Sequence, residues 1–450
     1  MIMLPTLDTL RARLADRQID AAEVVASCVA RIEDSAGEGR RVFPHGASPS
    51  AMAQAEASDA MRRFGVAGPL AGIPVSVKDL FDVQGEITRA GSRALSGAPA
   101  ARDAVAIGRL RAAGAILVGR TNMTEFAYSG LGINPHYGTP ANPFDRAAGR
   151  IPGGSSSGAA VSVTDGMAAA GIGSDTGGSC RIPAALCGVA GFKPTAARIP
   201  LQGAVPLSTS YDSVGSMAPS VACCAALDSI MAGDLEIQPH EAQALAGLRL
   251  AVPSAIVMEG LDAQVAAAFE RAIARLSAAG AIVKQVAFDS WQRLGALGEH
   301  GGLVAMEAWS WHVGLIKEQA GEYDPRVLAR IRLGSQNSIA EYVRMKALRS
   351  ELCLRADDEL QPYDAVVCPT VPIVAPRIAD LAEEAEYTAT NRLLLRNPAI
   401  ANMLDLCAVS IPCHAPGDEP VGLMLMGRHM SDRRVLAIGM DVENVVRQTR

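Results

Sequence analysis

Two short runs of glycine and serine are the part of this sequence best suited to chemistry. The first is GGSSSG at residues 153–158, and the second is DTGGS at residues 175–179. Glycine allows the backbone conformations that other residues avoid, and it lets backbone N–H groups approach a ligand closely. A serine hydroxyl beside such N–H groups can serve as a nucleophile next to an oxyanion hole. The two runs therefore indicate acyl transfer to a serine.

Three other interpretations of these runs make different predictions. A flexible linker is disfavoured because the segment between the runs is rich in alanine and valine and too apolar to stay solvated. A phosphate-binding loop is disfavoured because no Gly-Lys-Ser/Thr follows the glycines. The third is a nucleophile elbow, since residues 154–158 fit G-x-S-x-G with Ser156 at the centre. That site would also need a later acid and a later histidine, for which His414 is the best placed.

Four longer motifs identify a family resemblance. They are GIPVSVKD at residues 72–79, PGGSSSG at 152–158, SDTGGSCRIPAALCGVAGFKPT at 174–195 and SYDSVGSMAPSV at 210–221. Together they resemble the amidase signature family, whose two characteristic serines stand a fixed number of positions apart. Here Ser155 and Ser179 lie 24 positions apart, which satisfies that spacing. The resemblance is strongest over about residues 60–230 and weaker, but still visible, near the C-terminus.

The resemblance implies a catalytic set of one lysine and two serines. Ser179 would be the nucleophile, Lys78 the base, and Ser155 the bridge that passes the proton between them. The peptide bond leading into the bridging serine is cis in the family, which here is the bond between Gly154 and Ser155. Four backbone N–H groups would form the oxyanion hole, those of Thr176, Gly177, Gly178 and Ser179.

Lysine can act as a base only if its amine is neutral. An ordinary lysine has a pKa of about 10.4, so a mainly neutral amine near pH 7 needs a shift of more than about three units. Burial provides such a shift because desolvation disfavours the ammonium form. Lys78 lies at the end of the short apolar strand expected at residues 72–79, and we therefore expect it to be buried.

Neighbours of the catalytic set are expected to support it rather than react. Asp175 is predicted to hold its loop, and Ser156 and Ser157 to hold theirs through hydroxyl-to-backbone hydrogen bonds. Arg181 is interpreted as half of a structural ion pair in preference to a ligand for a substrate carboxylate. Cys180 adjoins the nucleophile without a sequence neighbour that could activate it, and is interpreted as a packing residue.

Alternating strand and helix patterns predict the elements that position these residues. The fold class expected is α/β, with a large, mixed, mostly parallel sheet covered by helices on both faces, as in the amidase signature fold. Residues 248–252, 262–279 and 282–286 predict one β-α-β unit, and residues 407–412 and 420–427 two late strands. The motifs spread along the chain, so residues 1–450 are expected to form a single amidase domain. The least familiar stretch, residues 288–345, is expected to cover the substrate side of the site.

Composition excludes several classes of protein. The formal net charge is −6 with no basic block, which disfavours direct nucleic-acid binding. Nine scattered cysteines without a C-x-x-C pair suit reduced thiols in the cytoplasm, and disfavour a zinc site. No secretory signal or long apolar run is present, so no membrane segment is expected. We expect no metal and no cofactor.

The function predicted is hydrolysis of a small-molecule, linear, non-peptide amide to an acid and ammonia or an amine. Two alternatives remain: the amidase subunit of a tRNA-dependent amidotransferase, and a catalytically silent scaffold subunit. The sequence is also compatible with a homodimer or with a small partner subunit. The acyl pocket is expected to be formed by residues 130–138, 203–210, and parts of 300–345 and 390–405. Apolar residues in or near these stretches suggest an uncharged alkyl or aryl amide, namely Met217, Leu303, Met306, Leu393 and Met403.

Overall fold

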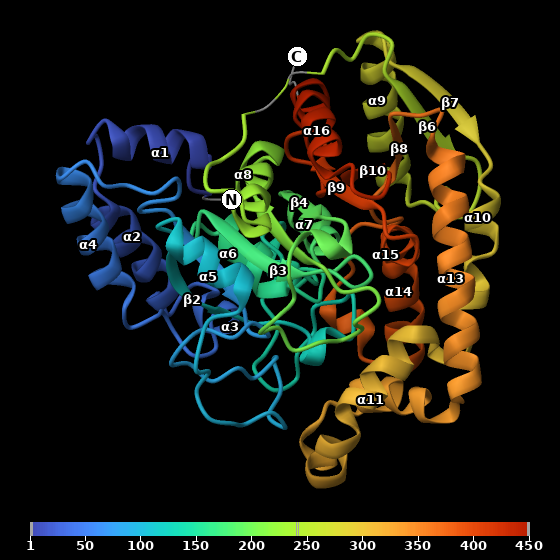
Figure 1. Cartoon of the computed structure of the whole chain (residues 1–450), viewed down its shortest axis with the longest axis horizontal. Coiled ribbons are helices and arrows are strands. Elements are labelled where there is room, and N and C mark those ends of the chain that lie inside the picture. Colours follow the sequence, from blue (N-terminus) through green and yellow to red (C-terminus); the bar gives the residue numbers. More distant parts are fainter. Residues whose placement is uncertain (1–2, 240, 242, 448–450) are drawn as a thin grey trace.

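The computed structural model describes residues 3–239, 241 and 243–447, and one sheet organises them (Figure 1). Ten strands lie in the spatial order β2-β1-β3-β5-β4-β9-β10-β8-β6-β7. Their bounds are β1 Pro74–Lys78, β2 Ile116–Thr121, β3 Ala170–Ser174, β4 Ala190–Lys193, β5 Val214–Ala218, β6 Arg249–Pro253, β7 Ile282–Val286, β8 Ala365–Pro369, β9 Cys407–Pro412 and β10 Gly422–Gly427. The predicted α/β fold with a large mixed sheet is confirmed.

Parallel and antiparallel pairing divide the sheet into three zones. Parallel pairs lie at both ends, where β1 joins β2 and β3, and β6 joins β7 and β8. The centre is antiparallel, from β3 through β5, β4, β9 and β10 to β8. The expected preponderance of parallel pairs therefore holds at the ends and not in the middle. Local patterns predicted most of the strands, though not β4 and β5, and strand direction depends on how the connections run between them.

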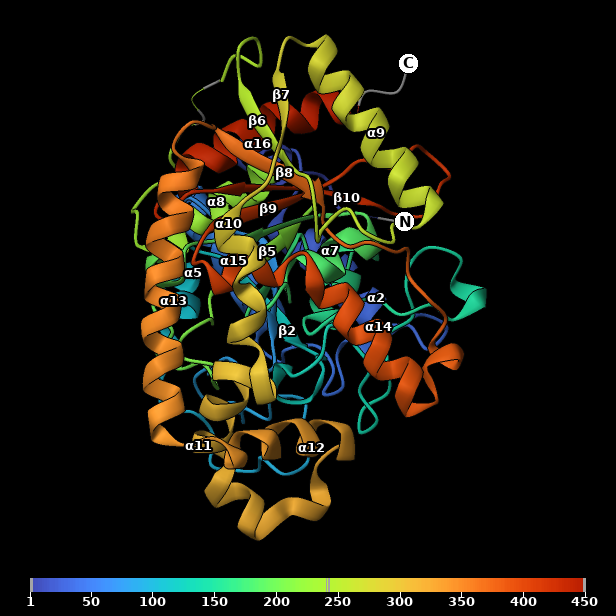
Figure 2. The same ribbon diagram turned by 90° about the vertical axis from the view of Figure 1, so that its right-hand side faces the viewer.

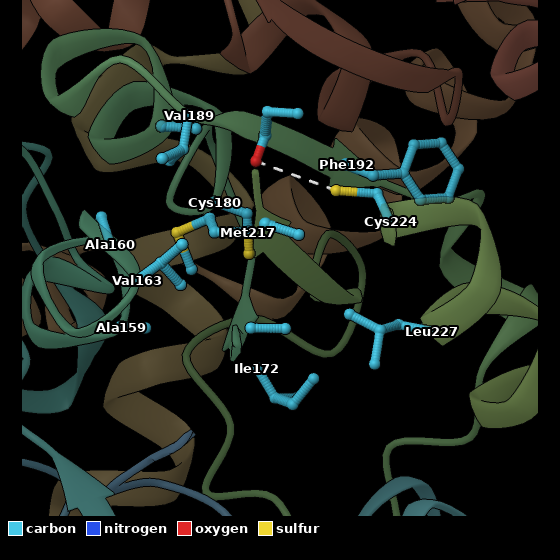
Figure 3. Close-up of a cluster of buried hydrophobic side chains, with 14 of the residues drawn as sticks. Ala159, Ala160, Val163, Ile172, Cys180, Val189, Phe192, Met217, Cys224 and Leu227 are labelled. Atoms are coloured by element: carbon cyan, nitrogen blue, oxygen red, sulfur yellow. Dashed lines mark hydrogen bonds between the residues drawn. The ribbon is translucent and has the colours of Figure 1, made fainter. Parts of the chain in front are cut away.

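Helices cover both faces of the sheet. Helix α6 (Ser157–Thr164) packs on β1, β2, β3 and β5, and α7 (Arg181–Cys187) on β4, β9 and β10. Helix α8 (Val221–Ala232) packs on β4 and β5, and α16 (Asp432–Val446) on β9 and β10. Figure 3 shows side chains of α6 on one side of the central strands and those of α8 on the other. The remaining helices are α1 Leu7–Ala15, α2 Ala21–Glu33, α3 Gly39–Val42, α4 Ala51–Arg63, α5 Val105–Ala112, α9 Ala263–Ala278, α10 Asp289–Gln292, α11 Gly302–Gln319, α12 Pro325–Leu333, α13 Ile339–Leu360, α14 Glu384–Arg396 and α15 Ala399–Met403.

The core between these layers is built from small and branched side chains. Figure 3 shows Ile172 of β3, Phe192 of β4 and Met217 of β5 between Val163 and Leu227 of the flanking helices. All five are at most 1% exposed. Gly171 of β3 lets α6 approach the sheet closely, since a Cβ added there would lie 2.6 Å from the Ala159 carbonyl oxygen. This close packing fixes the positions of the residues at the ends of α6 and β3.

A second set of helices stands away from the central layers. The segment from α11 to α13 forms the lower part of the molecule in Figure 2, with α13 running up one side. Ser338 caps the start of helix α13. Its hydroxyl accepts from the Glu341 N–H at 3.2 Å, while the Glu341 carboxylate accepts from the Ser338 N–H at 2.6 Å. This reciprocal cap starts a 22-residue helix. The stretch 288–345, which resembled nothing familiar, is thus largely helical.

Candidate active site

Lys78 occupies the end of β1, inside the sheet. The parallel register pairs Val77 with Ile172 of β3, so the end of β1 lies beside the end of β3. The Lys78 side chain is completely buried, and its Nζ donates to Ser155 Oγ at 2.7 Å and to Ser174 Oγ at 2.9 Å. Ser174 was absent from the predicted set. Only the strand register shows that a residue 96 positions away is its neighbour.

Burial changes the acid–base behaviour of this lysine. Desolvation lowers the pKa of Lys78 to about 8, and the negative charge of Asp175 limits the shift. An amine with such a pKa is partly neutral near physiological pH and can accept a proton. The expected burial of Lys78 is found, and its cause is the apolar strand that carries it.

Ser155 lies in a turn between a loop and the start of α6. The predicted cis peptide is present between Gly154 and Ser155. Glycine is required at position 154 because a Cβ there would lie 2.4 Å from the Gly132 nitrogen. The Ser155 carbonyl accepts from the Thr124 N–H at 3.0 Å, and the Ser156 N–H donates to the Ser179 carbonyl at 3.3 Å. The two glycine- and serine-rich turns are thereby joined.

Asp175 organises the turn that carries Ser179. Its carboxylate accepts from the N–H groups of Gly178 at 2.8 Å and Cys180 at 3.0 Å. The Arg181 guanidinium donates to the same carboxylate at 2.9 and 3.1 Å, and both side chains are completely buried. Burial alone would raise the pKa of Asp175, but the Arg181 charge holds it well below its ordinary value. Arg181 is therefore engaged in a structural ion pair, and Asn402 Oδ1 accepts from it as well at 2.7 Å.

The predicted oxyanion hole needs one correction. The Gly178 N–H donates to Asp175, so it is not available to a substrate and its predicted role is wrong. Among the described residues, the N–H groups of Thr176, Gly177 and Ser179 have no hydrogen-bond acceptor. The Thr176 hydroxyl donates to Asp212 at 2.5 Å, which holds the turn from its other side. Burial raises the pKa of Asp212 to about 6.

Ser179, Thr176 and Gly177 open onto a cavity of about 300 Å³. Its walls are mostly apolar, with polar groups from Ser129, Tyr211, Arg330 and Asn391. The other lining residues are Ala127, Tyr128, Leu207, Gly301, Val304, Leu333, Leu395, Ala399 and Met403. Segments far apart in the sequence therefore meet here, including four residues from the stretch 288–345.

The predicted acyl pocket is partly wrong. Residues 127–129 line the cavity in place of residues 130–138. Met217 belongs to the sheet core, and Leu303 and Met306 pack behind Tyr211 in a small cluster of their own. Of the five apolar residues suggested, Met403 lines the cavity. Arg330 and Asn391 lie within the predicted stretches 300–345 and 390–405, but they were not singled out, because no local pattern separates them from other polar residues on helices.

The nucleophile-elbow alternative lacks its partners. The Ser156 hydroxyl donates to the Ser174 carbonyl at 3.4 Å, and the Ser157 hydroxyl to the Asn122 carbonyl at 3.4 Å. His414 accepts from the Val421 N–H at 3.4 Å, and no histidine is among the described residues that line the cavity. Burial raises the pKa of the Cys180 thiol to about 12, so this cysteine is a packing residue.

The part of the chain that the structure describes has neither a metal-binding cluster nor a membrane-spanning helix. No group of three or more His, Cys, Asp or Glu side chains is arranged there to hold a metal ion. No helix in that part of the chain is both long and apolar enough to cross a membrane.

Comparisons with known proteins find one family along nearly the whole chain. The model of the family described as Amidase matches residues 23–436. A 2-amino-5-chloromuconic acid deaminase of Comamonas testosteroni is 36% identical, covering 97% of this chain and 95% of the relative. The A subunit of a glutamyl-tRNA(Gln) amidotransferase of Symbiobacterium thermophilum is 32% identical, covering 95% of this chain and 93% of the relative. A crystal structure of an amidase superposes with a TM-score of 0.87 at 32% identity, covering 98% of this chain and all of the other.

Proposed function

We propose that this chain, which belongs to the amidase signature family, hydrolyses a small, linear, non-peptide carboxamide. The bond cleaved is the C–N bond of the amide, and the products are a carboxylic acid and ammonia or an amine. The single observation that carries the proposal is the hydrogen bond of 2.7 Å between the buried Lys78 Nζ and Ser155 Oγ, next to a turn that presents Ser179 to a cavity.

The proposed mechanism moves one proton along this set. Neutral Lys78 takes the Ser155 hydroxyl proton as Ser155 takes that of Ser179, and Ser179 Oγ attacks the amide carbonyl carbon. The N–H groups of Thr176, Gly177 and Ser179 stabilise the oxyanion. The C–N bond then breaks, and the proton returns through Ser155 to the leaving nitrogen. Water attacks the acyl-enzyme with the same residues as base, which releases the acid and restores the Ser179 hydroxyl.

Ammonia release from primary amides, ureas and glutamine tests this function. The wild type is compared with Lys78→Ala and Ser179→Ala. We expect release from at least one amide, and its loss in both variants. Release that survives in Ser179→Ala would contradict the proposed nucleophile. His414→Ala is a control, because the nucleophile-elbow alternative predicts loss of activity there and our mechanism does not.

A second candidate function has support from the relatives. Several are A subunits of glutamyl-tRNA(Gln) amidotransferase and align along nearly the whole chain. That function requires glutamine as the amide and a partner subunit that receives ammonia. Purification with such a partner, together with release from glutamine alone, would favour it. No release from any substrate in the presence of co-purifying subunits would favour a scaffold role.

Location and assembly are parts of the same proposal. We propose a cytoplasmic protein, because all nine cysteines are free thiols and eight of them are buried. We also propose that the chain forms a homodimer or binds a small partner subunit, because helices α11–α13 have exposed faces. Light scattering of the purified chain measures its mass and separates a monomer from a dimer.

A further inference from the structure

Two hydrogen-bond donors line the cavity without an acceptor in the described part of the chain. Arg330 Nη2 is buried and has no partner there. Asn391 Oδ1 accepts from the Ser129 hydroxyl at 2.9 Å and from the Gly130 N–H at 2.8 Å. The NH₂ group of the same amide has no acceptor among the described residues. A buried donor without an acceptor, as Arg330 Nη2 is here, is uncommon in folded proteins and calls for an explanation.

The two head groups are held at the same wall. Arg330 Nη1 donates to the Tyr128 carbonyl at 2.7 Å, one residue before the Ser129 that binds Asn391. The guanidinium carbon lies 5.0 Å from the centre of the Tyr387 ring, and the Tyr387 hydroxyl donates to Ser129 Oγ at 3.0 Å. These contacts fix both side chains before any ligand binds, which is the condition for a preorganised subsite.

The positive charge of Arg330 has no counter-charge in this part of the structure. The lining of the cavity includes no aspartate or glutamate, and no ion pair of the described residues involves Arg330. Arg326, one turn earlier on α12, lies over the same Tyr387 ring at 4.3 Å but pairs with Glu384 at 2.9 Å. A guanidinium is charged at every physiological pH and binds carboxylates in a bidentate manner.

We infer that the substrate carries a carboxylate besides its amide, and that Arg330 and Asn391 bind this carboxylate while Ser179 faces the amide carbon. The aliphatic part between the two groups would lie along Leu207, Val304 and Leu395. This inference rests on the proposed amide hydrolysis and replaces the uncharged amide expected from the apolar residues. Arg330 is then a specificity residue for the class of ω-amido carboxylates.

Matched substrates test the inference. Succinamic, glutaramic and adipamic acids carry the carboxylate, while butyramide, pentanamide and hexanamide match them in length without it. We expect the wild type to have a higher kcat/KM for at least one acid than for its neutral partner. In Arg330→Met, kcat/KM for that acid falls about 10- to 100-fold, the range for a charged hydrogen bond, while the neutral amide changes less than about threefold. Arg330→Lys keeps the charge without the planar fork and recovers part of the loss.

Arg326→Met is the control, because this arginine stacks on the same ring without lining the cavity. It leaves the ratio of kcat/KM between acid and neutral amide unchanged. Equal losses for both substrates in Arg330→Met would show a structural role and overturn the inference. A wild type that prefers the neutral amides would overturn it as well.

Binding separates this inference from the proposed function. Calorimetric titration of Ser179→Ala with glutaramic acid is repeated in the double variant Ser179→Ala/Arg330→Met. Binding that is lost only in the double variant supports the carboxylate subsite even if the wild type releases no ammonia, in which case the proposed function alone fails. If amides are hydrolysed at rates that do not depend on Arg330, the proposed function is supported and the carboxylate subsite is overturned.

Discussion

The two walls of the cavity are built in different ways. On the nucleophile side, every residue of α6 and α7 is buried, and the carboxylate of Asp175 binds two backbone N–H groups and a guanidinium. On the substrate side, the segment α11–α13 has exposed apolar side chains, among them Trp311, Ile339 and Val343. Arg330 there has an unused donor. The difference indicates that the turn carrying Ser179 is held by a rigid core, whereas the opposite wall is a more exposed layer. Under the proposed function, substrate choice depends on a few residues of that layer.

The largest effect should follow from changing the reacting atoms. We expect Ser179→Ala to lower kcat by about 10⁴-fold or more, because Ser179 is the proposed nucleophile and the Thr176 hydroxyl in the same turn is engaged with Asp212. Lys78→Met should cause a loss of similar size. Rates of ammonia release at saturating substrate measure both. A residual rate within about tenfold of the wild type would contradict the division between the two walls.

Stability should differ sharply between the buried ion pair and an exposed one. Asp175→Asn leaves Arg181 buried without a counter-charge, which costs about 3–5 kcal/mol in free energy of unfolding. Glu384→Gln breaks the Arg326 pair, in which Glu384 is 64% exposed, and should cost less than about 1 kcal/mol. Urea denaturation of both variants measures the contrast. Similar costs would show that the two walls are equally rigid.

The pH dependence of activity should report Lys78. Only the neutral amine accepts a proton, so kcat/KM should rise about tenfold per pH unit below a midpoint near 8, and level off above it. Lys346, whose Nζ donates to Ser210 Oγ at 2.9 Å on the substrate side, provides the control. The midpoint should be unchanged in Lys346→Met. A midpoint that moves in this variant would contradict the assignment of the pH dependence to Lys78.

Glu307 of α11 links the two walls, and its removal should have an intermediate effect. Its carboxylate accepts from the Ser208 hydroxyl at 2.6 Å and from the Ser210 N–H at 2.9 Å, in the turn that leads to Asp212. In Glu307→Gln, kcat/KM should fall about tenfold. A shift of Asp212 is passed to Thr176 through the hydrogen bond between them, and a small displacement of Thr176 misplaces the oxyanion donors. Steady-state kinetics beside Glu318→Gln, a control at an exposed residue of the same helix, tests this. An effect no larger than that of the control would show that the walls act independently.

The smallest effect is expected at the exposed face of α13. Val343 is 59% exposed, so Val343→Ala should change the free energy of unfolding by no more than about 0.5 kcal/mol. Val163 of α6 is completely buried, and Val163→Ala should cost about 2 kcal/mol or more. Thermal denaturation of the pair compares them. A larger cost at Val343 would indicate that a partner covers this face.

Much of the fold could be predicted because local patterns carry it. The β-α-β unit predicted at residues 248–286 is present as β6, α9 and β7, and the two late strands are present as β9 and β10. The antiparallel centre of the sheet could not be predicted in the same way. Hydrophobic periodicity marks a strand, but its direction and neighbours follow from long-range packing.

By itself, the sequence determined the family and the candidates Lys78, Ser155 and Ser179, because long ordered motifs with a set spacing carry that information within single stretches of chain. Only the tertiary structure decided which groups surround them. The parallel register places Ser174 against Lys78, and a hydrogen bond to Asp175 removes Gly178 from the oxyanion donors. On α12, Arg326 and Arg330 belong to the same helical pattern, yet one pairs with Glu384 and the other lines the cavity. Such contacts join residues distant along the chain, and no local pattern encodes them.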